Sequence, residues 1–195
     1  MTTNTMPIVA TFHTDERTSG TPAEVSSYGT MRHMMTAILP DGDIEASEGL
    51  GGLKLRTPLK ELKHVLWEFE VRRGSEEGWY ELVGLYEARY DLGPVAIGVD
   101  VHNGKVFKLI AQEGYAGKLF STIEVGMNVG EAMSLEPRLF YDEAEEGLYV
   151  RGYAGVTLDV PEIDPPSEKV PRYPISAISV YAEEAVSPEG QRGNW

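Results

Sequence analysis

The sequence predicts an α+β fold, and three observations lead to this prediction. Five apolar residues between 57 and 69 share one face at helical spacing: Leu59, Leu62, Val65, Leu66 and Phe69. Between residues 80 and 90, apolar or aromatic residues and one glycine occupy every second position, which is the period of a β-strand. The Asn103-Gly104 pair between two apolar runs is typical of a tight β-hairpin turn. We therefore expect short helices packed against an antiparallel sheet.

The first half of the chain contains an arm, one helix and several strands. Residues 1–38 are rich in Thr, Ser and Gly and are expected to form a weakly structured arm, in which only 7–14 has the pattern of a strand. Thr57 is expected to cap the helix that starts at Pro58, and Trp67 to pack in the core. Strands are expected to follow up to residue 111, with a turn at 74–78.

The second half repeats this order. A strand is expected at 122–125, followed by a helix from Asn128 to Leu135 in which Asn128 and Glu131 form a capping box. Strands follow at 138–143, 147–152, 155–160 and 175–183, the last closing the sheet. Five prolines within 161–174 predict a stiff irregular connection, and 185–195 is expected to be a tail.

The two halves align with an offset of 70 residues. Leu53 then matches Ile123, Leu55 matches Val125, Leu59 matches Val129, and Leu62 matches Ala132. A repeated strand–helix–antiparallel-strand unit explains these matches, with one unit at 39–117 and another at 118–184. Two unrelated amphipathic helices would give similar matches, so both explanations stay open.

Residues 44–184 carry a resemblance to known families. The stretch "IEVGMNVGEAMSL" resembles the opening of the α-β repeat of β-lactamase inhibitor proteins and of outer-membrane assembly lipoproteins, although the Gly-Met pair is replaced by Arg56-Thr57 in the first copy. This chain lacks the cysteine that such lipoproteins carry. The stretch "GVDVHNGKVFKLIAQEGY" and the residues after it are similar to immunity proteins that accompany bacterial polymorphic toxins. The resemblance implies a protein that binds a cognate toxin and occludes its active site.

The composition restricts the possible partners. The net charge of −14 disfavours binding to nucleic acid and favours a basic protein, such as a nuclease toxin. The chain has no cysteine, no secretory signal and no membrane-length apolar run, so we expect a cytoplasmic monomer without a cofactor or membrane contact.

Motifs for catalysis are absent from the sequence. No nucleophile elbow, phosphate loop or metal-ligand spacing of histidines occurs, and we expect no enzyme activity. Asp100 and His102 could form a metal or acid–base pair, or could be ordinary polar residues of a hairpin turn. Two further hypotheses stay open: an unrecognised enzyme that uses the carboxylates at 142–146, and a module that self-associates through sheet edges.

The candidate binding surface lies between residues 136 and 168, where nine acidic and two basic residues give a net charge of −7. Tyrosines between these carboxylates are typical anchors of protein interfaces, although tyrosine is also common in strands. Trp79 follows a predicted turn and is a further candidate. The predicted partner-binding residues are Tyr141, Asp142, Glu143, Glu145, Glu146, Tyr149, Tyr153, Asp159, Glu162, Asp164 and Trp79.

Overall fold

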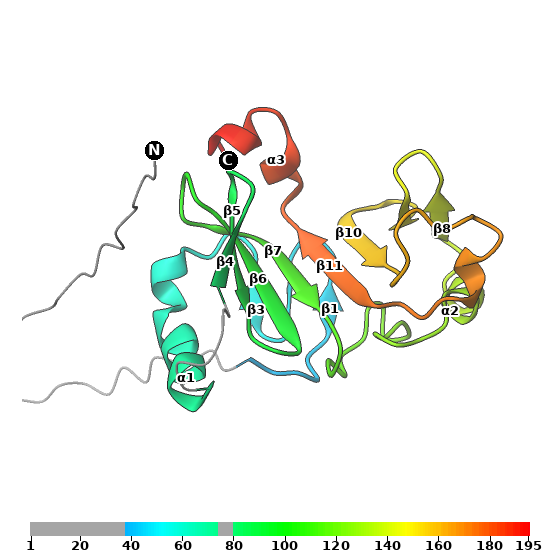
Figure 1. Cartoon of the computed structure of the whole chain (residues 1–195), viewed down its shortest axis with the longest axis horizontal. Coiled ribbons are helices and arrows are strands. Elements are labelled where there is room, and N and C mark those ends of the chain that lie inside the picture. The colour runs from blue at the N-terminus through cyan, green and yellow to red at the C-terminus, as the bar shows by residue number, and fades with distance from the viewer. Residues whose placement is uncertain (1–37, 74–79) are drawn as a thin grey trace, which may run out of the picture. The chain divides into compact units, whose positions relative to one another are not determined.

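An eight-stranded antiparallel sheet organises the part of the chain that this computed structural model describes, residues 38–73 and 80–195 (Figure 1). From one edge to the other the strands are β4 (Tyr80–Val83), β5 (Glu87–Asp91), β6 (Val95–Asp100), β7 (Val106–Ala111), β11 (Ala177–Tyr181), β10 (Tyr153–Asp159), β9 (Gly147–Val150) and β8 (Leu139–Asp142). The protein is therefore α+β, as predicted. Residues 1–37, the turn at 74–78 and Trp79 lie outside the described residues, and so does the predicted strand at 7–14.

Smaller elements accompany the large sheet. A three-stranded sheet consists of β1 (Ile44–Glu45), β2 (Gly49–Leu50) and β3 (Leu53–Lys54). The helices are α1 (Lys63–Arg73), α2 (Val129–Leu135) and α3 (Glu183–Val186), with 3₁₀ turns η1 (Leu59–Glu61), η2 (Val170–Arg172) and η3 (Gly190–Arg192). Figure 1 shows α1 beside the β4 end of the sheet and α2 beside the β8 end. Among the described helices, none has both the length and the apolar character needed to cross a membrane.

The two faces of the sheet differ in composition. Directly paired residues of an antiparallel sheet point to the same face. One row of paired residues faces the core and consists of Val95, Ala111, Ile178, Leu158, Leu148 and Tyr141. The corresponding row on the second face consists of Ala96, Ile110, Ser179, Thr157, Tyr149 and Phe140. The core face also packs against the small sheet and the helices, within one cluster of buried residues.

Strand β11 lies in the middle of the sheet, not at its end. It pairs with β7 on one side and with β10 on the other. The two predicted units, 39–117 and 118–184, therefore supply four neighbouring strands each, and they meet at the β7–β11 pair.

The segments that match in the sequence also make matching backbone contacts. Arg56 and Gly126 both have positive φ, 68° and 88°. The Arg56 N–H donates to Val106 O over 2.7 Å, and the Gly126 N–H donates to Ile175 O over 2.8 Å. In the other direction, the Val106 N–H donates to Thr57 O over 2.9 Å, and the Ile175 N–H donates to Met127 O over 2.8 Å. The two segments therefore share the same local backbone geometry, while duplication of the unit stays a prediction.

Several local predictions differ from the structure. Residues 185–195 are predicted to be a tail, but they contain the end of α3 and all of η3, with Ala185 and Gly190 buried. The first helix starts with η1 and then α1, and the carbonyl of Thr57 accepts from Val106 instead of Thr57 acting as its cap. Trp67 is 66% exposed, because it lies on the solvent side of α1. Residues 122–125 form no strand, because positive φ at Phe120 and Ser121 turns the chain so that Leu119 and Ile123 bond each other.

Candidate functional site

The β8–β9 hairpin carries the predicted carboxylates at its tip. The Asp142 Oδ1 accepts from the backbone N–H of Ala144 over 2.9 Å and from that of Glu145 over 3.4 Å, which fixes the turn. Glu143, Glu145 and Glu146 are exposed to solvent. No group of three or more metal-ligating side chains occurs within the described residues. The carboxylates at the tip are therefore not buried, whereas the alternative hypothesis of an enzyme at 142–146 would require buried ones.

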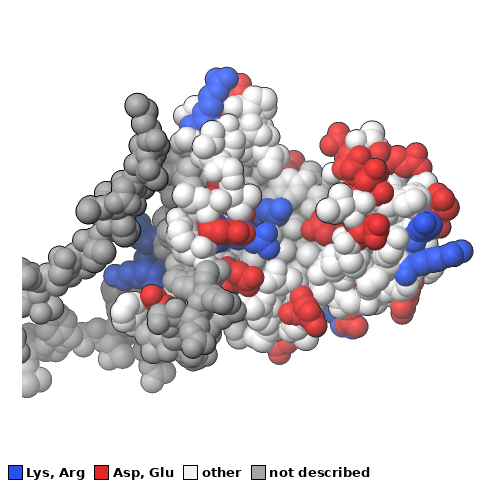
Figure 2. All heavy atoms as spheres, in the orientation of Figure 1, with Lys and Arg blue, Asp and Glu red and all other residues white. Residues whose placement is uncertain are grey.

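Four predicted residues line one shallow hollow on the second face of the sheet. We call it the hairpin hollow; it has a volume of about 720 Å³, and its lining includes Asp142, Glu145, Tyr149 and Tyr153. Phe140 and Arg151 also line it, with the Arg151 guanidinium 5.1 Å from the centre of the Phe140 ring. Figure 2 shows acidic side chains gathered at this end of the structure, with basic side chains beside them. The hollow thus combines carboxylates and aromatic rings.

The pKa values of Tyr149 and Tyr141 are raised by different carboxylates. Burial raises the pKa of the Tyr149 phenol, and the negative charges of Glu145 and Asp142 raise it further. Burial also raises the pKa of Tyr141, but there the added negative charges belong to Asp164, Glu146 and Glu143. Of these acidic residues, Asp142 and Glu145 line the hollow and act on Tyr149, whereas the charges of Asp164, Glu146 and Glu143 act on Tyr141.

Tyr141 contributes to packing. It belongs to the core-facing row of the sheet, and its hydroxyl donates to the carbonyl of Pro165 over 3.3 Å. Its ring also packs against the core cluster. The structure therefore separates Tyr141 from the other predicted anchors, because consecutive residues of a strand point to opposite faces.

Tyr153 is held at the rim of the hollow by a stack of side chains. Its ring lies 4.7 Å from the Phe120 ring, centre to centre, and 4.7 Å from the Arg138 guanidinium. Arg138 donates from Nε to Glu136 Oε1 over 2.7 Å, and this pairing uses one of the two positive charges of the acidic segment. Tyr153 keeps 40% of its surface exposed, so a partner can reach a ring whose position is already fixed.

Three other predicted residues lie outside the hollow. Asp159 ends β10 on the second face; neighbouring groups desolvate its carboxylate and raise its pKa, against the opposing charges of Lys108 and Arg89. Glu162 and Asp164 are exposed in the proline-rich connection after β10. Trp79 lies outside the described residues, so its predicted role has no structural counterpart here.

Sequence reasoning missed Phe140 and Arg151, although strand alternation places Phe140 on the same face as Asp142 and could have indicated it.

The Asp100–His102 pair has a simple structural role. Asp100 Oδ1 accepts from the His102 backbone N–H over 2.8 Å, and Asp100 Oδ2 accepts from the Trp195 indole over 2.6 Å. The polar-turn alternative therefore explains this pair.

The fold and the site define an α+β protein with an acidic, aromatic surface hollow. No family model matches the sequence, and no curated protein matches it. The crystal structure of the uncharacterized protein YfeY from Escherichia coli matches 70% of this chain and 97% of that chain, with 12% sequence identity and a TM-score of 0.45. This similarity is too weak to assign a function.

Proposed function

We propose that this protein is a cytoplasmic immunity protein that binds a cognate bacterial toxin and neutralises it by occluding the toxin's active site. The observation that carries the proposal is the exposed acidic tip of the β8–β9 hairpin beside the hairpin hollow. The resemblance of residues 44–184 to immunity proteins supplies the link to a toxin. Such a protein meets its toxin in the compartment where both are made.

Charge selects the partner in this proposal. The net charge of −14 and the exposed glutamates Glu143, Glu145 and Glu146 attract a basic protein and repel nucleic acid. A nuclease toxin has a basic active-site surface because it must bind phosphates. An acidic protein that covers that surface competes directly with the substrate of the toxin.

Aromatic contacts then hold the complex. Tyr149 and Tyr153 both line the hollow, and each packs against a neighbouring ring, Tyr149 against Phe140 and Tyr153 against Phe120. Rigid aromatic side chains lose little entropy on binding and are common among interface hot spots. These residues therefore act mainly on the dissociation rate, whereas the glutamates act mainly on the association rate.

The test begins with capture of the partner. The full chain is co-purified with its partner from a lysate of the native host, and the partner is identified by mass spectrometry. The captured protein is then expressed in a neutral bacterial host with and without this chain. The proposal expects the captured protein to stop growth alone and this chain to restore growth. A captured protein that is harmless when expressed alone contradicts the proposal.

A matched pair of variants locates the binding surface. The test variant replaces Glu143, Glu145 and Glu146 by Lys and leaves Asp142 in place, because Asp142 fixes the turn. The control variant replaces the exposed residues Glu61, Glu70 and Glu113 by Lys and changes the net charge by the same amount. Growth protection is expected to be lost only in the test variant. Equal loss in both variants would show that net charge alone, and no particular surface, binds the toxin.

Self-association through a sheet edge is a second candidate function. Strand β4 forms one edge of the large sheet, and all four of its residues are exposed, Leu82 by 64%. An exposed apolar edge strand can pair with another copy. Light scattering of the purified chain decides this question: a dimer that Leu82→Lys dissociates supports self-association, and a monomer at all tested concentrations excludes it.

A further inference from the structure

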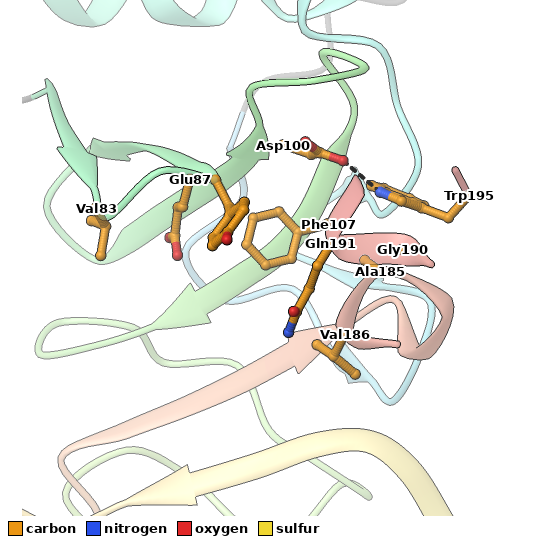
Figure 3. Close-up of a pocket in the computed structure, with 10 residues that line it drawn as sticks. Val83, Glu87, Asp100, Phe107, Ala185, Val186, Gly190, Gln191 and Trp195 are labelled. Atoms are coloured by element: carbon orange, nitrogen blue, oxygen red, sulfur yellow. Dashed lines mark hydrogen bonds between the residues drawn. The ribbon is translucent and has the colours of Figure 1, made fainter. Parts of the chain in front are cut away.

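A second cavity lies far along the sheet from the hairpin hollow. It has a volume of about 210 Å³ and lies between the β4–β5 hairpin, strands β6 and β7, and the C-terminal elements α3 and η3 (Figure 3). We call it the C-terminal pocket. Nothing in the proposed toxin binding uses it.

The C-terminal segment closes this pocket through contacts with the β6–β7 hairpin. Asn103 Nδ2 donates to Gly193 O over 3.3 Å, and Lys105 Nζ donates to Trp195 O over 2.6 Å. Gly193 has a φ of 81°, and a Cβ at this position would lie 2.6 Å from the Cβ of His102. The close approach of the segment therefore depends on a glycine at 193.

The walls of the pocket are mostly apolar and aromatic. Tyr86, Phe107 and Trp195 contribute rings, and Val83, Ala185 and Val186 contribute aliphatic surface. Figure 3 shows Glu87 and Gln191 on either side of the Phe107 ring, with Trp195 beyond it near Asp100. Lys105 Nζ lies 5.0 Å from the centre of the Trp195 ring, so this ring already attracts one cation.

The charge of the lining is negative. Glu87 and Asp100 are directly paired residues of β5 and β6, and carboxylates in such a pair repel each other. Asp100 is compensated, because it accepts from the Trp195 indole and from the His102 N–H. Glu87 has no hydrogen bond or ion pair within the described residues, and the ten lining residues include no Lys or Arg.

The side chain of Glu87 occupies space that Gly98, which has no side chain, leaves free on β6. A Cβ at Gly98 would lie 2.8 Å from Glu87 Oε1 and 3.1 Å from the Cβ of Lys108. The carboxylate thus lies across β6, on the face where the pocket opens. Arg89 and Lys108 are the strand neighbours of Gly98 on this face, but Glu87 makes no ion pair with either. A ligand with a positive charge would supply the missing partner and remove the repulsion from Asp100.

From this arrangement we propose that the C-terminal pocket binds an alkylammonium or guanidinium group. Glu87 is the counter-ion, the Tyr86 and Phe107 rings contact the cation and its alkyl part, and the amide of Gln191 lies at the rim. The volume suits a group of a few heavy atoms, smaller than a drug-sized ligand. Such a group belongs either to a free small amine or to a Lys or Arg side chain of a protein.

The test is a titration of the full chain followed by NMR. The probes are n-butylammonium and N-acetyl-argininamide, with n-butanol as the neutral control. Both cations are expected to shift the Trp195 indole N–H and the amides of Glu87 and Phe107 in a saturable way. Saturation by n-butylammonium alone indicates an alkylammonium group as the ligand, of a free amine or of a Lys side chain, and saturation by N-acetyl-argininamide alone indicates a guanidinium group.

Matched variants make the test specific. Glu87→Gln keeps the shape of the side chain, removes the counter-ion and is expected to weaken the cation's affinity by about tenfold or more. Glu113→Gln removes the same charge from an exposed position outside both proposed sites and is expected to leave the affinity unchanged. Gln191→Trp fills the rim at an exposed position and is expected to abolish binding.

Three results overturn the proposal: no saturation by either cation, equal binding of n-butanol, or equal loss of affinity in Glu87→Gln and Glu113→Gln. None of these results bears on toxin binding, because the hairpin hollow and the C-terminal pocket share no lining residue.

Discussion

Asp100 shows how one buried carboxylate connects distant parts of the chain. It is only 6% exposed, and both of its oxygens accept hydrogen bonds, one from its own hairpin and one from Trp195. A buried acceptor that loses its donor retains the desolvation cost without compensation. The indole of Trp195 therefore stabilises the hairpin as well as closing the C-terminal pocket.

Replacing Trp195 by Phe is expected to lower the free energy of unfolding by about 1–3 kcal/mol, because Asp100 Oδ2 then loses the indole N–H. Urea unfolding followed by circular dichroism measures the change. Trp67→Phe is the control, since Trp67 is 66% exposed, and it is expected to leave the stability unchanged. Equal stability of both variants and the wild type would contradict the role of Asp100.

The Glu136–Arg138 pair gives the stability a defined pH dependence. The hydrogen bonds from Arg138 hold the pKa of the 7% exposed Glu136 below its ordinary value of 4.5. A lowered folded-state pKa contributes stability above the unfolded-state pKa, and this contribution is lost as the pH falls through the folded-state value. Glu136→Gln should therefore make the unfolding free energy less dependent on pH below 4.5 than in the wild type.

Urea unfolding between about pH 6 and about pH 3 checks this expectation. Glu113→Gln, at an exposed position, serves as the control and should keep the wild-type slope. A Glu136→Gln variant with the same slope as the wild type would show that Glu136 does not contribute to acid unfolding.

Individual site residues could be predicted from the sequence only in part. Asp142, Glu145, Tyr149 and Tyr153 do line one hollow, because they lie close in the chain on neighbouring strands. The C-terminal pocket could not be predicted, because its Trp195–Asp100 contact joins residues 95 positions apart. No local pattern encodes such a contact.

Helix α2 depends on its N-terminal cap. The Asn128 Oδ1 accepts from the Gly130 N–H over 3.1 Å, so Asn128 caps the helix as predicted, but within the described residues Glu131 makes no bond back to Asn128 and the predicted capping box does not form. The Asn128 Nδ2 donates to Arg172 O over 3.1 Å and so ties the helix to η2. One side chain thus caps the helix and joins it to the proline-rich connection.

Replacing Asn128 by Ala is expected to destabilise the protein by about 0.5–2 kcal/mol, because the cap of α2 is lost. Asn128→Asp keeps the acceptor for Gly130 and loses the donor to Arg172, so it is expected to cost less. Urea unfolding of both variants measures the difference. If Asn128→Asp costs as much as Asn128→Ala, the bond to Arg172 and not the cap stabilises this region.

Most elements could be predicted from periodicity, but several boundaries could not. The hairpin at Asn103-Gly104, helix α2 and the last four strands occur where they were predicted, but the last strand, β11, lies inside the sheet and does not close it. The start of α1 differs because Arg56 and Thr57 bond to Val106, some 50 residues later in the chain. Contacts of this kind override the local propensity of Thr57 to act as a cap.

The order of the strands is a property of the whole molecule. Strands β7 and β11 are neighbours in the sheet, although β8, β9 and β10 lie between them in the chain. This pairing leaves β4 and β8 as the two edges, so the acidic hairpin lies at one edge and the C-terminal pocket close to the other. Periodicity predicts each strand but contains no information about this order.

The distribution of charge over the whole molecule predicts how the protein associates with a basic toxin. Between about 50 mM and about 500 mM salt, the association rate constant is expected to fall by about tenfold or more, because salt screens attraction between separated charges. The dissociation rate should change much less, because it depends on contacts already formed, such as those of Tyr149 and Tyr153. Stopped-flow fluorescence with the captured partner measures both rates.

The same pair of triple variants tests whether the tip of the β8–β9 hairpin causes the salt dependence of the association rate. Replacing Glu143, Glu145 and Glu146 by Lys should flatten the salt dependence of association, whereas the control at Glu61, Glu70 and Glu113 should retain most of it. Both variants have the same net charge, so a difference between them can arise only from where the charges lie. Equal flattening in both would mean that the total charge of −14, and not the acidic tip of the β8–β9 hairpin, steers the partner.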